Sequence, residues 1–158
     1  MSEGLPIPSG DDLPRVTQTE QQESQSRLED YLEVIYHLMH DKGYASNVDI
    51  AERLGVKPPT VSSMLQKLAS REYLVYEPYR GIRLTDKGAK IAKSVIRRHS
   101  IILELLLMLG VEEDVAYEDT EGIEHHIQPV TMRRIEGLVD FLRKDPKLVR
   151  AIRDHIEG

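Results

Sequence analysis

The chain has 158 residues, of which 40% are hydrophobic and 30% charged, ordinary values for a soluble protein of one or two small domains. Cysteine is absent, which excludes disulfides, thiolate metal sites and cysteine nucleophiles. The sequence has no run of about 18 apolar residues and no basic-then-apolar leader, so we expect a cytoplasmic protein without a membrane partner.

The net charge of −6 conceals a segregation of charge along the chain. Residues 57–98 contain ten Lys or Arg and three acidic residues, whereas residues 112–126 contain seven acidic residues and no Lys or Arg. A basic middle segment is typical of a surface that contacts phosphate. The acidic segment fits either a metal site or a solvated helix face, and composition leaves both alternatives open.

The N-terminal segment differs from the rest of the chain. Residues 1–26 are polar, contain three prolines and show no periodicity, which predicts a disordered tail. A helix is expected over residues 28–42, where apolar residues recur at helical spacing until Gly43.

A helix-turn-helix unit is predicted next. Ser46 and Asp49 resemble a capping box that opens a short helix over residues 48–54. A tight turn at Gly55 follows, and a proline at 58 or 59 begins a helix that continues to about residue 72.

The remaining elements are a hairpin and a series of helices. Residues 73–77 and 82–85 bracket a glycine-containing turn and predict a β-hairpin. Further helices are expected at 86–109, 112–127, 131–144 and 147–156.

This order of elements is that of a winged helix-turn-helix head, so the predicted fold is mainly α. We divide the chain into a disordered tail (1–26), a winged-helix DNA-binding domain (27–93) and an all-helical second domain (94–158). Small polar side chains near the start of the second helix of a helix-turn-helix are suited to base edges, and basic side chains to phosphate. The predicted DNA-binding residues are Pro59, Thr60, Ser62, Ser63, Lys67 and Arg80.

Several carboxylates and histidines fall at spacings that favour a metal site. Glu121, Glu124 and His125 stand at i, i+3 and i+4, on one face of a helix. Asp30 and Glu33 likewise share a face of the first helix.

His99 lies on the largely apolar side of the long helix, where a histidine is more often a core residue than a ligand. Taken together, these six side chains are four carboxylates and two imidazoles, whose charge of −4 two divalent cations would cancel. Without metal, converging carboxylates repel one another or raise each other's pKa.

The chain from about residue 28 to residue 142 resembles the manganese transport regulator branch of the diphtheria toxin repressor family, and five stretches carry the resemblance. They are LEDYLEVIY at 28–36, IAERLGV at 50–56, YRG at 79–81, RH at 98–99 and EDTEGIEHH at 118–126. The resemblance implies a winged-helix head followed by a helical dimerisation domain with a binuclear metal site. It also implies that Glu33 and Glu124 bridge two ions and that the ligands are Asp30, Glu33, His99, Glu121, Glu124 and His125.

The resemblance also indicates the metal. The iron-sensing branch has Met and Cys at the positions of Asp30 and Glu121, and an all-oxygen and nitrogen set favours Mn²⁺ over Fe²⁺. We expect two Mn²⁺ per subunit in a homodimeric regulator of double-stranded operator DNA, a repressor of manganese uptake genes. Apolar residues of the long helix, among them 101–109, and of the helices that follow are expected at the dimer interface, unless residues 131–156 cover 101–109 within one chain.

Two other functions are compatible with parts of the sequence. A dinuclear carboxylate enzyme would use a similar ligand set, but the Glu-x-x-His motif of such four-helix sites does not occur in this chain. The third alternative is a winged-helix module that binds a protein and holds a structural metal. DNA footprinting would distinguish it from a DNA-binding regulator.

Overall fold

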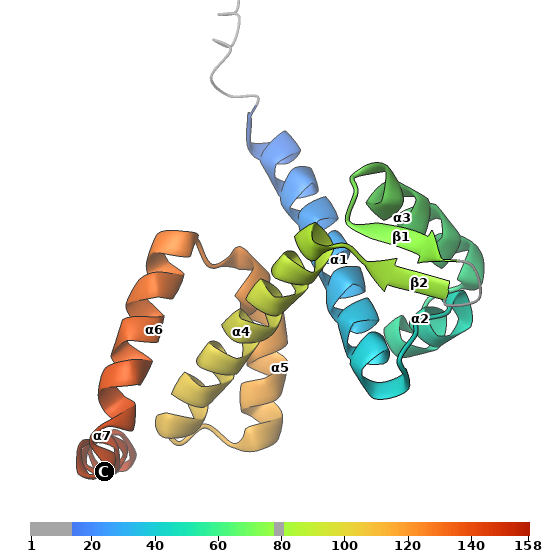
Figure 1. Cartoon of the computed structure of the whole chain (residues 1–158). Coiled ribbons are helices and arrows are strands. Elements are labelled where there is room, and N and C mark those ends of the chain that lie inside the picture. The colour runs from blue at the N-terminus through green and yellow to red at the C-terminus, as the bar shows by residue number, and fades with distance from the viewer. Residues whose placement is uncertain (1–13, 78–80) are drawn as a thin grey trace, which may run out of the picture.

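The computed structural model describes residues 14–77 and 81–158. Within these ranges the chain forms seven α-helices, a 3₁₀ turn and one hairpin (Figure 1). Their bounds are α1 Pro14–Lys42, α2 Asn47–Leu54, α3 Pro58–Ser70, β1 Leu74–Glu77, β2 Gly81–Leu84, α4 Asp86–Met108, α5 Glu113–Ile123, η2 Glu124–His126, α6 Pro129–Arg143 and α7 Pro146–Glu157.

Helix α1 begins at Pro14, well before the start expected near Leu28. The prediction of disorder is therefore wrong for residues 14–26, and residues 1–13 lie outside the described ranges. Glutamine, glutamate and arginine dominate residues 20–27, and their straight side chains favour a helix even without an apolar stripe. Once the apolar part of α1 has nucleated, each added turn costs little.

The head is built around the apolar stripe of α1, which packs against α2, α3 and the hairpin. Side chains from each of these elements form one buried cluster, which includes Leu32 and Ile35 of α1, Ile50 of α2, Leu65 of α3 and Ile82 of β2. Burial of each of these side chains contributes about 1.5–3 kcal/mol. The winged-helix prediction is confirmed.

Local sequence signals fix the angle between α2 and α3. The backbone N–H of Asp49 donates to Oγ of Ser46 at 3.2 Å, which caps α2. Gly55 ends α2 with φ of +64°, a left-handed conformation that glycine adopts without strain.

The wing is an antiparallel pair in which Leu74 faces Leu84 and Tyr76 faces Ile82. Its second strand leads directly into α4, whose start lies close to the hairpin. A Cβ on Gly88 would lie 2.0 Å from the carbonyl oxygen of Tyr73, so only glycine permits this approach. The wing and α4 are therefore joined tightly.

Helix α4 connects the two halves of the molecule. It crosses α1 near the hairpin and continues between α5 and α6 (Figure 1). The short turn η2 follows α5 and contacts both α1 and α4. Three segments that are far apart in the sequence therefore meet at η2.

The helix predicted over residues 112–127 is shorter than expected. It ends at Ile123, and residues 124–126 form the 3₁₀ turn η2 before Ile127 becomes extended. Proline at position 129 starts α6, so the chain must leave the α5 axis before that residue. Among residues 14–77 and 81–158, no helix has the length and apolar character needed to cross a lipid bilayer.

Candidate functional site

One group of potential ligands lies around His99 on α4. Its Nδ1 donates to Oε2 of Glu124 at 2.8 Å and lies 3.2 Å from Oε1 of Glu121. One donor atom from each of these three residues lies within 4.8 Å of the other two. Hard divalent cations bind oxygen at about 2.0–2.6 Å, so one ion fits between atoms at this spacing.

A second group lies around His125 of η2. Its Nε2 is 2.9 Å from Oδ1 of Asp30 on α1 and 3.3 Å from Oε1 of Glu124. The two oxygens of Glu124 therefore face different imidazoles, Oε1 toward His125 and Oε2 toward His99. Glu124 is the residue that joins the two groups.

Glu33 lies at the edge of this arrangement. Its Oε1 is 3.7 Å from Nε2 of His37, one turn further along α1. Together with Asp30, Glu121 and Tyr117 it lines a cavity of about 420 Å³. Burial raises the pKa of Glu33, and the nearby imidazoles of His37 and His99 oppose that rise.

The electrostatics of the cluster reflect a buried carboxylate among bases. Glu124 is 1% exposed, and burial raises its pKa to about 7 although His99 and His125 act in the opposite direction. Hydrogen bonds to Asp30 and to Glu29 raise the pKa of His125 to about 10. Both groups therefore hold a proton to a higher pH than they would in water.

The sequence did not indicate Glu29, which contacts the cluster. Nδ1 of His125 donates to Oε2 of Glu29 at 3.0 Å, and Arg98 pairs with the same oxygen. Burial acts to raise the pKa of Glu29, but His125 and Arg98 outweigh it and lower the pKa overall. Both Glu29 and Arg98 precede a predicted ligand in the chain, and that adjacency was the available signal.

Five of the six residues predicted to bind DNA lie on α3, away from its buried residues. Pro59, Thr60, Ser63 and Lys67, with Met64, line a shallow groove of about 540 Å³.

Two predicted DNA-binding residues of α3 have partners within the protein. Oγ of Ser62 accepts a hydrogen bond from Asn47 at 2.7 Å and donates to the carbonyl of Pro58 at 3.2 Å. Lys67 donates to Oγ of Ser24 on α1 at 3.0 Å. Arg80, the remaining predicted contact, lies outside the described residues.

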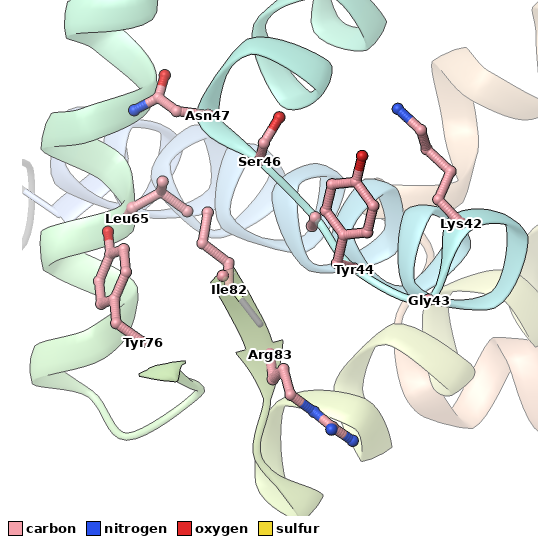
Figure 2. A pocket seen from close by; sticks show the side chains of 11 residues that line it. Lys42, Gly43, Tyr44, Ser46, Asn47, Leu65, Tyr76, Ile82 and Arg83 are labelled. Carbon is pink, nitrogen blue, oxygen red and sulfur yellow. The ribbon is translucent and has the colours of Figure 1, made fainter. Parts of the chain in front are cut away.

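A larger pocket, of about 770 Å³, lies in the head between the α1–α2 connection and the wing (Figure 2). Tyr76 and Leu65 lie on its α3 side, and Tyr44 and Lys42 lie opposite them. Lys42 is paired with Asp49 at 2.5 Å. The pocket is thus separate from the acidic cluster and mainly apolar.

Comparison with known families identifies this arrangement. A model described as the iron dependent repressor N-terminal DNA binding domain matches residues 24–82, and one described as the iron dependent repressor metal binding and dimerisation domain matches residues 85–149. The chain belongs to the iron-dependent repressor family. The resemblance to the diphtheria toxin repressor family seen in the sequence motifs is thereby confirmed.

Within the iron-dependent repressors, the similar curated proteins are named HTH-type transcriptional regulator MntR. The protein of Geobacillus kaustophilus is 47% identical over 127 residues, which cover 80% of this chain and 90% of the relative. The protein of Bacillus subtilis is 48% identical over 118 residues, which cover 75% and 83%.

Solved structures of manganese regulators have the same fold. The structure of the manganese regulator SloR matches with a TM-score of 0.65 and 31% identity, over 72% of this chain and 54% of that chain. A manganese-dependent transcriptional repressor in complex with manganese matches with a TM-score of 0.64 and 30% identity, over 72% and 53%. The chain spans about half the length of these solved structures.

Binding of Mn²⁺ to this cluster is expected to release protons, because a cation competes with protons for the same lone pairs. Near pH 6 both Glu124, with a pKa of about 7, and His125, with a pKa of about 10, hold a proton, whereas near pH 8 only His125 does. We therefore expect about one more proton released per subunit near pH 6 than near pH 8. The apparent affinity should accordingly rise with pH through the neutral range.

Isothermal titration calorimetry in buffers of different ionisation enthalpy measures this release. The control is Glu118→Gln, the same chemical change at an exposed position of α5, which should release as many protons as the wild-type protein at each pH. Equal proton release from the wild-type protein at the two pH values would show that Mn²⁺ does not displace a proton from Glu124.

Proposed function

We propose that the chain is a manganese-responsive DNA-binding transcriptional regulator, a repressor of manganese uptake genes that two Mn²⁺ per subunit activate for operator binding. The observation that carries the proposal is the position of Glu124. Its two oxygens face two imidazoles, and the cluster around it joins α1 of the head to α4 and η2.

The donor set supports manganese as the metal. The proposed ligands are oxygen and nitrogen atoms only, a chemistry that suits hard Mn²⁺ and lacks the thiolate or thioether that softer ions prefer. Two dications would balance the four carboxylates. The proposed ligand set is Asp30, Glu33, His99, Glu121, Glu124 and His125. Glu33 is included because it lies on α1 and lines the same cavity as Asp30 and Glu121.

The link from metal to DNA is proposed to run through α1. This helix forms much of the buried core of the head, and it also carries Asp30 and Glu33. Ligands on α1 and on η2 would be drawn together by shared cations, whereas their negative charges repel without them. The orientation of the head relative to the long helix α4 then depends on metal. A coupling of about 1–3 kcal/mol per site is enough for a usable switch.

A homodimer would place two such heads on successive major grooves. The second half of the chain exposes large apolar side chains that suit an interface. Val115 and Ile123 of α5 and Leu138 and Phe141 of α6 are between 43% and 60% exposed. We propose that this surface forms the dimer. A regulator that acts on operator DNA also belongs where the chromosome lies, and we propose the cytoplasm.

The enzyme alternative uses the same donor set. We propose that the cluster senses metal and does not catalyse a reaction, because the relatives are transcriptional regulators.

The second prediction concerns the metal switch. Wild-type protein should bind a duplex from the promoter of a manganese importer gene about 5- to 150-fold more tightly with Mn²⁺ than with chelator. Glu124→Gln removes the charge that faces both imidazoles, so it should abolish that gain. Fluorescence anisotropy with labelled duplex measures both affinities.

The matched control for this switch is Glu118→Gln, the same chemical change at an exposed position of α5. This control variant should keep the full response to Mn²⁺. Equal wild-type affinity with Mn²⁺ and with chelator would refute the proposed function, and an unimpaired Glu124→Gln variant would refute the role of that residue.

The third prediction concerns the DNA-binding face. Lys67 is proposed to contact a phosphate, so Lys67→Ala should reduce the slope of log affinity against log salt concentration by about 0.9. Lys144→Ala, at an exposed position after α6, should leave the slope unchanged. If the two variants have the same slope, Lys67 serves only its hydrogen bond to Ser24.

A further inference from the structure

We propose that Glu29 is a positioning residue that orients His125 toward metal. This inference rests on the proposed function and assigns a role to a residue outside the predicted ligand set. Its basis is that Glu29 and its neighbour Asp30 contact opposite nitrogens of one imidazole ring.

The two nitrogens of the His125 ring contact different groups. Nδ1 of His125 donates to Oε2 of Glu29 at 3.0 Å. On the other edge, Nε2 lies 2.9 Å from Oδ1 of Asp30 and 3.3 Å from Oε1 of Glu124. Nε2 is therefore the nitrogen that shares its surroundings with other proposed ligands, and Nδ1 faces away from them.

Glu29 is itself held in place from two sides. Arg98 of α4 pairs with Oε2, and Nε2 of Gln25 donates to Oε1 at 3.3 Å. The side chain of Glu29 is 13% exposed and that of Arg98 is 21% exposed, so water screens their attraction only in part. The carboxylate thus has a fixed position from which it can hold the ring of His125.

Glu29 is suited to support a ligand but not to replace one. Its Oε2 already accepts hydrogen bonds from His125 and Arg98, and it lies at the edge of the ring opposite Asp30. A carboxylate that accepts the proton of one imidazole nitrogen leaves the other nitrogen unprotonated for metal and increases its basicity. Loss of such a partner typically lowers metal affinity about 10- to 100-fold.

The test compares Glu29→Ala with Glu29→Gln by calorimetric titration of the full-length chain with Mn²⁺. Glu29→Ala should still bind two ions, one of them about 10- to 100-fold more weakly than in the wild-type protein. Glu29→Gln keeps an oxygen that can accept the Nδ1 proton, so it should lose less affinity than Glu29→Ala. Glu23→Ala, the same substitution at an exposed position of α1, should match the wild-type protein.

Nuclear magnetic resonance provides a readout that a merely structural role would not change. In Cd²⁺-loaded wild-type protein, long-range ¹H–¹⁵N spectra should show the ring proton of His125 on Nδ1. In Glu29→Ala, exchange broadening or loss of that Nδ1 signal is expected because its acceptor is absent. In Glu29→Gln the Nδ1 signal should persist, because the amide oxygen can accept the same proton, and the weaker Mn²⁺ binding of this variant remains measurable should Glu29→Ala fail to fold.

The outcomes separate this inference from the proposed function. If the wild-type protein binds two ions and both Glu29 variants keep its affinity and its His125 tautomer, only the role of Glu29 is overturned. Complete loss of one ion in Glu29→Gln would also overturn it, since Glu29 would then be a ligand. A wild-type protein that binds no Mn²⁺ would overturn the proposed function as well.

Discussion

The carboxylate of Glu124 is buried between two imidazoles that come from different segments of the chain, and the rest of the site depends on this contact. A carboxylate that is 1% exposed carries a large desolvation cost unless positive charge compensates it. The imidazoles of His99 and His125 supply part of that compensation, since both act to lower the pKa of Glu124. Shared cations would supply it more strongly, because each carries two charges.

The fold provides this contact by interrupting a helix. If α5 continued through residues 124–126, the helical repeat of α5 alone would set the directions in which the side chains of Glu124 and His125 point. The 3₁₀ turn instead carries these two residues across the crossing of α1 and α4. Carboxylates on α1 then face them from the head, so any change in charge at the cluster acts on the packing between the head and α4. A metal site at such a crossing is well placed to control the orientation of the head.

Much of the fold follows from local sequence patterns. The apolar stripe of α1, the cap at Ser46 and the turn at Gly55 each act over a few residues, and the structure confirms the winged-helix architecture that they predicted. The start of α1 at Pro14 was not predictable from periodicity, because that part of the helix has no apolar face. The end of α5 at Ile123 was missed because Glu121, Glu124 and His125 fit an unbroken helix equally well.

The site was predictable to the extent that spacing places side chains on one face. The structure brings His99, Glu121 and Glu124 together, as well as Asp30 with His125, but Glu33 lies beside His37 at the edge. Ligand roles for all six residues stay predictions. Glu29 escaped notice because neighbouring residues of a helix point about 100° apart, so spacing assigned it to another face than Asp30. Only the path of η2 along the flank of α1 brings His125 between the two.

The most direct measurement is a crystal structure of the manganese-loaded dimer with anomalous scattering recorded at the manganese absorption edge. Two anomalous peaks per subunit are expected, one beside His99 and Glu121 and one beside His125 and Asp30, with an oxygen of Glu124 bound to each. Peaks located elsewhere, or a Glu124 carboxylate turned away from both ions, would contradict the central role of this residue.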